Sequence, residues 1–183
     1  MELILIKPKR TSKCKICRAE YVKRSMSHKV CGPDCAIALN EKEKKLKEAK
    51  IDKTRKEALK SLSDLKQEAQ TVFNAFIRER DKELPCISCG RSTGCKINAG
   101  HYLSVGSHPQ LRYDEQNCWL QCEYCNTYKS GNQAAYRIEL VNRVGLPFVE
   151  ALESDQTIKK WTREELIELK FIYREKLKEL KNN

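Results

Sequence analysis

The sequence predicts a small α+β protein that is built from separate modules, and three observations lead to this prediction. The chain has 183 residues, of which 10 are cysteines, and eight of these fall into two groups with the spacing of zinc ligands. Charged residues make up 33% of the chain and aromatic residues only 7%, with a mean hydropathy of −0.68. Because so little apolar material cannot form one large core, we expect small zinc-stapled modules joined by long exposed helices.

Both cysteine groups predict a structural zinc ion. Cys86-Ile-Ser-Cys89 and Cys122-Glu-Tyr-Cys125 are C-x2-C pairs, and two such pairs can surround one tetrahedral zinc with thiolates. The other zinc would be bound by the N-terminal group, which is Cys14, Cys17, Cys31 and Cys35. The sequence shows neither a signal peptide nor an apolar run of transmembrane length. We therefore expect an intracellular protein with no membrane partner, in which zinc is favoured over disulfides. Cys95 and Cys118 are left over and are expected to be free, buried thiols.

The chain divides into four expected parts. Residues 1–38 form a four-cysteine zinc finger, and residues 39–83 a charged helical arm. Residues 84–136 form a second zinc module, and residues 137–183 a C-terminal helical region. Residues 36–82 contain no proline or glycine and predict helix. Between Glu41 and Glu57, 13 of 17 residues are charged, which predicts a solvated helix. From Ala58 onward, apolar residues recur at a spacing of three and four and predict one buried face.

Residues 84–136 carry polar side chains that a purely structural zinc module does not need. A β-hairpin is expected from residues 96–103 and 118–121, with a helical element starting at Asn126. The first strand contains His101, and Asn117 precedes the second strand. An imidazole can take a proton from water near neutral pH, which is a step that phosphodiester hydrolysis requires. Each of these residues also has a structural alternative. His101 could be a packed core histidine, Asn117 an ordinary turn residue, and Asn126 a helix N-cap.

This layout resembles the HNH (ββα-metal) endonucleases over about residues 84–132, and a resemblance to the phage NinG recombination proteins extends over most of the chain. The second resemblance is carried by Ala99-Gly100-His101-Tyr102, Leu111-Arg112-Tyr113, Cys125-Asn126 and Lys129-Ser130-Gly131-Asn132. It implies a ββα-metal core and a DNA endonuclease that acts on branched recombination intermediates, such as Holliday junctions and D-loops. It also implies that His101 is the general base, that Asn117 orients this base, and that Asn126 binds a catalytic divalent cation.

One position departs from the HNH pattern. Many HNH nucleases carry an acidic metal ligand just before the base, where this chain has Gly100. Asp114 is the nearest acidic residue and a candidate ligand of the cation, and His108 and Asn132 offer further donor atoms. Mg²⁺ prefers carboxylate and water, whereas a ligand set with few carboxylates tolerates Mn²⁺ better. We therefore expect one catalytic divalent cation, Mg²⁺ or Mn²⁺, besides the two structural zinc ions.

The charge of the chain predicts a polyanionic partner. The formal net charge is +11, and two four-cysteine zinc units, each of charge −2, would lower it to about +7. DNA is the expected partner, and a solvated surface rich in lysine and glutamate is the alternative. Arg112, Lys129 and Arg137 are the candidate phosphate contacts near the site. The aromatic residues nearest to the site are expected in the core of the hairpin: Tyr102, Tyr113 and Trp119.

We therefore expect a metal-dependent, HNH-type DNA endonuclease in the cytoplasm of a bacterial host. A homodimer and contacts with phage or host recombination proteins are further partners that the sequence leaves open. The alternative function is a non-catalytic zinc protein that binds DNA or a recombination partner. The His101, Asn117 and Asn126 pattern favours the enzyme, whereas Gly100 in place of an acid favours the binding protein.

Overall fold

The computed structural model describes residues 11–182, which form two compact units. The first unit ends at Lys60, and the second begins at Ser61. Each unit contains one of the two cysteine groups.

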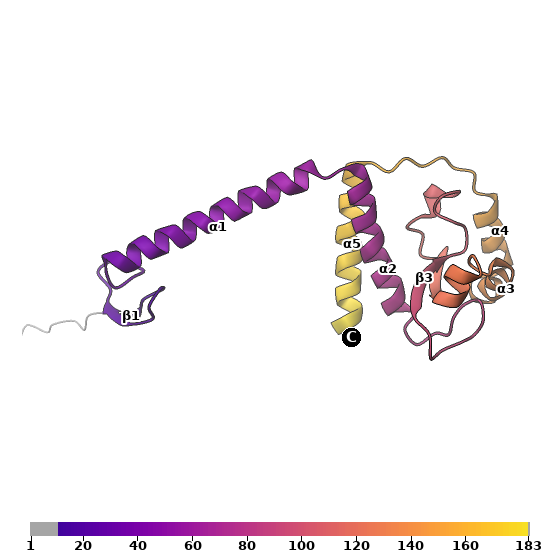
Figure 1. The fold of residues 1–183 in the computed structure, drawn as a ribbon, viewed down its shortest axis with the longest axis horizontal. Helices are drawn as coiled ribbons and strands as arrows, with labels where there is room; N and C mark the ends of the chain where they lie inside the picture. Colours follow the sequence, from indigo (N-terminus) through magenta and orange to yellow (C-terminus); the bar gives the residue numbers. More distant parts are fainter. Residues whose placement is uncertain (1–10, 183) are drawn as a thin grey trace, which may run out of the picture. The chain divides into compact units, whose positions relative to one another are not determined.

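The first unit consists of a short hairpin and one long helix (Figure 1). β1 (Thr11–Lys13) and β2 (Glu20–Val22) pair in antiparallel orientation, and α1 (Pro33–Leu59) follows. Pro33 stands at the start of α1, where a residue without a backbone N–H costs no hydrogen bond. No residue of α1 is buried, which confirms the solvated helix expected from its charged sequence.

The helix expected over residues 36–82 is interrupted after α1. Ser61 caps a new helix, α2 (Leu62–Arg80), and its hydroxyl accepts a hydrogen bond from the Asp64 backbone N–H at 3.1 Å. The Asp64 carboxylate accepts one from the Ser61 N–H at 3.0 Å. This reciprocal pair satisfies two N–H groups at the start of α2, so a helix begins here although neither proline nor glycine marks the break.

The second unit contains all remaining elements: α2, β3 (Ile97–His101), the 3₁₀-helix η1 (Pro109–Leu111), β4 (Cys118–Cys122), the π-helix η2 (Tyr124–Tyr128), α3 (Gln133–Val144), α4 (Leu146–Ser154) and α5 (Arg163–Asn182). β3 and β4 form the expected antiparallel hairpin, in which Gly100 lies opposite Trp119 and His101 opposite Cys118. The unit is thus a mixed α+β structure with a single two-stranded sheet among its described residues.

The hairpin separates two apolar clusters. On one side, Ala99 and Cys118 pack with Phe73 of α2 and Tyr173 of α5. α2 and α5 lie side by side and run in the same direction (Figure 1), and Lys170 of α5 forms an ion pair with Glu68 of α2. On the other side, a second cluster joins the hairpin to α3 and α4: Ile87, Tyr102, Leu111, Tyr136, Leu140, Val149 and Leu152. The hairpin is therefore held from both faces.

The helix ends of the C-terminal region follow the sequence closely. α3 ends at Gly145, which has a φ of +88° and so adopts a conformation that favours glycine. Pro147 then lies in the first turn of α4. Thr162 and Glu165 form the expected capping box before α5, with the Thr162 N–H donating to the Glu165 carboxylate at 2.8 Å. None of the helices described within residues 11–182 is long and apolar enough to span a membrane.

Candidate functional site

The C-terminal cysteine group has the geometry of a zinc site. The four Sγ atoms of Cys86, Cys89, Cys122 and Cys125 lie within 4.8 Å of one another, and three of these residues are buried. The Cys89 and Cys122 sulfurs are 3.7 Å apart. Four sulfurs at about 2.3 Å from a tetrahedral zinc lie about 3.8 Å from each other, so this cluster fits the ion.

The N-terminal group fits zinc equally well. The Sγ atoms of Cys14, Cys17, Cys31 and Cys35 also lie within 4.8 Å of one another. Cys31 lies 3.5 Å from Cys17 and 3.7 Å from Cys35, the latter in the first turn of α1. The two remaining cysteines belong to neither cluster. Cys118 is fully buried, as expected, and burial raises the pKa of its thiol, whereas Cys95 is only half-buried.

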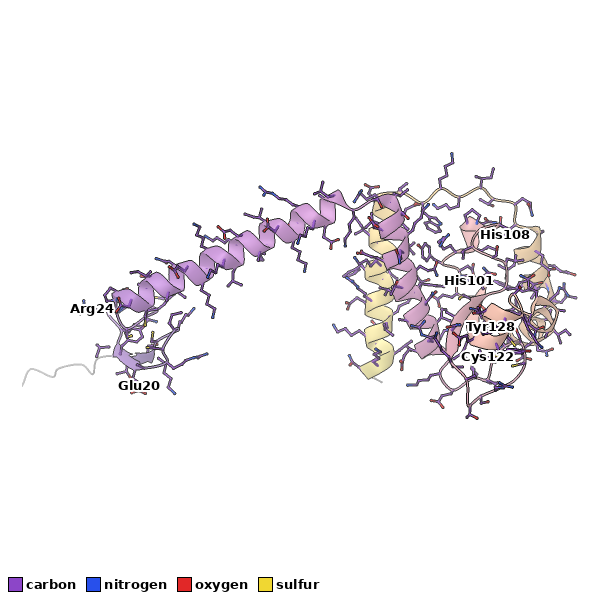
Figure 2. All side chains as sticks on the ribbon, viewed as in Figure 1. Glu20, Arg24, His101, His108, Cys122 and Tyr128 are labelled. Atoms are coloured by element: carbon purple, nitrogen blue, oxygen red, sulfur yellow. The ribbon has the colours of Figure 1, made fainter. Side chains whose placement is uncertain are left out.

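His101 ends β3 and is half-buried against α2 (Figure 2). Its Nε2 donates a hydrogen bond to the Arg112 carbonyl at 2.9 Å, and its Nδ1 lies 3.7 Å from the Cys118 sulfur. Burial lowers the pKa of this imidazole, and the nearby Arg112 charge acts in the same direction. A neutral ring with a proton on Nε2 leaves Nδ1 as the atom that can accept a proton.

Asn117 closes the loop that holds His101 in place. Its side chain is fully buried and accepts from the Leu103 N–H at 2.8 Å. Its amide also donates to the carbonyls of Leu103 at 3.0 Å and Leu111 at 3.2 Å. Since Leu111 precedes Arg112, whose carbonyl binds the imidazole, Asn117 fixes the loop segment that orients His101. The resemblance implies that Asn117 orients the base, and this role stays a prediction.

Asn126 is half-buried in the middle of the π-helix η2. It is not a helix N-cap, so the structural alternative considered for it is wrong. The N-cap of α3 is Asn132, which has a φ of +44° and whose side-chain amide lies 3.7 Å from the Cys125 sulfur. η2 contributes Cys125 to the C-terminal cysteine cluster, and single π-turns of this kind are frequent at functional sites.

The expected catalytic cation has no preformed carboxylate site. Among residues 11–182, the only groups of three or more His, Cys, Asp or Glu side chains close enough to share a metal are the two cysteine clusters. The Asp114 carboxylate accepts from the N–H groups of Gln116 at 2.7 Å and Asn117 at 3.0 Å, so it stabilises a turn. A side chain at position 100 would collide with Gln121. The ionisable residues present therefore do not fit an acidic metal site.

The three basic residues expected to contact phosphates differ in their surroundings. The Arg112 guanidinium donates to the Gln70 side chain at 3.2 Å, and Arg137 forms a two-point ion pair with Glu153 at 2.7 and 3.0 Å. Lys129 is exposed, and its ammonium lies 5.1 Å from the centre of the Tyr124 ring. Lys129 is thus the most available of the three, whereas Arg112 and Arg137 make internal contacts.

The aromatic residues near the hairpin fall into two groups. Tyr102 and Tyr113 are buried, as expected, and Trp119 is half-buried with the guanidinium groups of Arg80 and Arg143 over its ring. Two tyrosines that the sequence reasoning did not single out are instead exposed on η2: Tyr124 and Tyr128. The cysteine spacing gave no signal for their exposure, because Ile87, which lies within the first C-x2-C pair, is buried.

Comparison with known proteins places the whole chain in one group. The family model described as the bacteriophage lambda NinG protein matches residues 6–183. The protein ninG of Escherichia phage 933W is 41% identical over 197 aligned positions, which cover 98% of each chain. The ninG proteins of Salmonella phage P22 and Escherichia phage lambda are each 42% identical over 171 positions and 84% of each chain. No solved structure matches the chain.

Proposed function

This chain belongs to the NinG family of bacteriophage lambda, and from that premise we propose that it is a metal-dependent endonuclease that cuts branched DNA during phage recombination. The observation that supports catalysis best is the setting of His101. Its pKa is lowered by burial, and the Arg112 carbonyl fixes its orientation at 2.9 Å. A neutral, oriented imidazole is the form that a general base requires. The preference for branched DNA rests on the resemblance to NinG recombination proteins.

In this proposal, Nδ1 of His101 takes a proton from water, the water oxygen bonds to the scissile phosphorus, and the bond from phosphorus to the 3′ oxygen breaks. Nδ1 lies 3.7 Å from the buried Cys118 sulfur, so the proposal requires that the water reach Nδ1 when DNA is bound. Asn117 keeps the loop closed, so that the imidazole is oriented before DNA binds. Asn126 and Asp114 are the proposed donors for a divalent cation, although the Asp114 carboxylate also accepts the turn hydrogen bonds of Gln116 and Asn117. Because these two residues form no larger ligand group within residues 11–182, water and the DNA phosphate would have to supply the other ligands, and the cation would supply positive charge at the phosphate. Lys129 contacts the DNA backbone, with Arg112 and Arg137 contributing where their internal contacts open. The reaction takes place inside the bacterial host. Association with a second copy of the chain is testable by light scattering of the purified protein, and association with recombination proteins is testable by co-purification.

The decisive experiment measures cleavage of four-way, three-way, flapped and linear DNA with Mg²⁺ and with Mn²⁺. We expect the wild type to cut a branched substrate and His101→Ala to lose about 10² to 10⁴ in rate, the usual contribution of a general base. Zinc content and DNA affinity should stay near those of the wild type. His108→Ala is the matched control, because within the described residues the His108 side chain forms a hydrogen bond only with the Ser107 hydroxyl, at 3.0 Å. Equal cleavage by His101→Ala and wild type would falsify the role of His101.

A second candidate function is a non-catalytic zinc protein that binds branched DNA or a recombination partner. The absence of an acidic metal cluster within residues 11–182 favours it. The two functions differ in one result. If the zinc-loaded wild type binds branched DNA but cuts no substrate with either cation, the binding function replaces the enzymatic one.

A further inference from the structure

The π-helix η2 presents two neighbouring tyrosine rings to solvent. Tyr124 is 52% exposed and Tyr128 is 73% exposed, whereas Tyr102, Tyr113, Tyr136 and Tyr173 are all buried. The two ring centres lie 6.3 Å apart, with an angle of 33° between the ring planes. Two large rings side by side at the surface have an energetic cost in water, so their exposure requires an explanation.

The local backbone explains why the two rings meet. The Lys129 N–H donates to the Tyr124 carbonyl at 3.0 Å, which is the five-residue hydrogen bond of a π-turn. Tyr124 and Tyr128 are four residues apart, which is about one helical turn, so their side chains project from the same face of η2. Tyr124 also stands between the zinc ligands Cys122 and Cys125, which fix its backbone. The rings are therefore held together before any partner binds, which lowers the entropic cost of binding.

The charges around the rings indicate the kind of partner. The Lys129 ammonium lies 5.1 Å from the centre of the Tyr124 ring, and the Lys96 carbonyl accepts a hydrogen bond from the Glu123 N–H at 2.8 Å, next to η2. Lys96 also forms an ion pair with Glu123 at 2.8 Å, so Lys129 is the cation without an acidic partner among the described residues. Aromatic faces beside a basic group are the usual combination for nucleic acid bases that have left the double helix.

We infer that Tyr124 and Tyr128 form a stacking platform for the unpaired bases at the branch point of a DNA substrate. The inference rests on the proposed function and specifies what it recognises, because branched DNA differs from linear duplex in having bases that can leave the stack. Asn126 lies between the two tyrosines in the sequence of the same π-helix. Other exposed aromatic residues lack this setting. Phe171 of α5, for example, is 65% exposed and has no aromatic neighbour within the described chain.

The test measures equilibrium binding by fluorescence anisotropy, without added divalent cations so that cleavage is suppressed. The ligands are single-stranded oligo-dT, a three-way junction with unpaired bases at its centre, and a linear duplex of equal length. The variants are Tyr124→Leu/Tyr128→Leu and Tyr124→Phe/Tyr128→Phe, with Phe171→Ala as the control for loss of an exposed aromatic ring. Zinc content is checked for each variant, because η2 carries a zinc ligand.

We expect the leucine variant to bind the single strand and the junction more weakly, by roughly 5- to 150-fold for each base stack lost. Its affinity for duplex should change by less than about twofold, because phosphate contacts dominate duplex binding. The phenylalanine variant and Phe171→Ala should bind as the wild type does. A leucine variant with unchanged affinity for all three ligands, or with an equal loss on duplex and single strand, would overturn the platform.

The outcome is independent of whether the protein cuts DNA. If the wild type cuts no substrate but the leucine variant loses affinity only for unpaired bases, the platform stands and the enzymatic function fails. If the wild type cuts branched DNA but the leucine variant keeps the full preference for single strand and junction over duplex, the enzymatic function stands and the platform fails.

Discussion

The side-chain oxygen of Gln121 occupies the space beside Gly100 that a β-carbon would need. A β-carbon built on Gly100 would lie 2.1 Å from the Gln121 Oε1 and 2.9 Å from its Cβ. The Gln121 amide donates to the Ser88 hydroxyl at 2.7 Å and to the Gly131 carbonyl at 2.6 Å. Its Oε1 is buried without a conventional donor among the described residues, and it faces the Gly100 Cα–H, which can form a weak contact. Gln121 thus connects β4 to Ser88, which lies within the first C-x2-C pair, and to Gly131, which follows the second pair.

This contact predicts the outcome of restoring the acidic residue of the HNH pattern. Gly100→Asp should lower the free energy of unfolding by about 1–3 kcal/mol or more, the usual cost of overpacking, and should reduce cleavage. Gly106→Asp is the matched control, because a β-carbon there meets only the Ser104 hydroxyl at 3.9 Å. Chemical denaturation and the cleavage assay measure the two effects. A Gly100→Asp protein that is as stable as wild type and binds Mn²⁺ more tightly would contradict this expectation.

The separation of the two units predicts how zinc loss affects each of them. The protein should contain two zinc ions per chain by elemental analysis, one for each cysteine cluster. Cys122→Ser should unfold the second unit, because zinc binding supplies much of the folding free energy of such modules. Cys14→Ser should remove one zinc but leave the thermal unfolding of the second unit unchanged, since that unit begins only at Ser61.

The control for the zinc prediction is Cys95→Ser, because Cys95 lies beside the C-terminal cluster but outside it. This variant should keep both zinc ions and its cooperative unfolding. A folded Cys122→Ser protein that lacks zinc in the second unit would show that the metal is not needed for the structure.

The hydrogen bonds of Asn117 predict a joint loss of stability and activity. Asn117→Ala removes three buried hydrogen bonds, which together contribute about 2–4 kcal/mol to stability. The loop between Leu103 and Leu111 should loosen, so the Arg112 carbonyl would no longer fix the imidazole. Cleavage should therefore fall even at temperatures where the variant remains folded. Gln116→Ala, an exposed neighbour, should change neither quantity.

Local patterns made much of this fold predictable from the sequence. The two cysteine clusters follow from short spacings, and the hairpin and the capping box at Thr162 follow from turn and cap residues close in sequence. Family resemblance singled out His101 and Asn117 as candidate site residues, and the structure places Asn117 in the loop that carries the Arg112 carbonyl, while their catalytic roles stay predictions. Each C-x2-C pair and the capping box depend on residues that are near one another in the chain, so a single sequence contains the information.

The features that could not be predicted depend on long-range or unusual local geometry. Arg137 was expected to contact DNA, but its ion pair with Glu153 forms only because α3 packs on α4. The contact between Gly100 and Gln121 requires the register of β3 and β4. The π-turn that exposes Tyr124 and Tyr128 requires a hydrogen bond pattern that no residue preference specifies.

The environment of His101 predicts a specific dependence on pH. Burial, with the Arg112 charge, lowers the pKa of the folded protein's imidazole below its ordinary value of 6.5, although the Arg112 carbonyl and Asp114 act in the opposite direction. The unfolded chain therefore binds this proton at a higher pH than the folded chain does. The stability that the neutral imidazole contributes is complete above about pH 6.5 and is lost as the pH falls through the folded pKa.

Cleavage should follow the same titration, because only the neutral imidazole can take a proton. The acid limb of kcat/KM should have its midpoint below pH 6.5, and the rate should not rise further above that pH on account of His101.

The free energy of unfolding is compared between wild type and His101→Gln from pH 5 to 8. His108→Gln is the control, and zinc retention is measured at each pH. The difference between wild type and His101→Gln should grow as the pH rises toward 6.5 and then stay constant. A midpoint above 6.5, or a constant difference over the whole range, would show that burial does not control this imidazole.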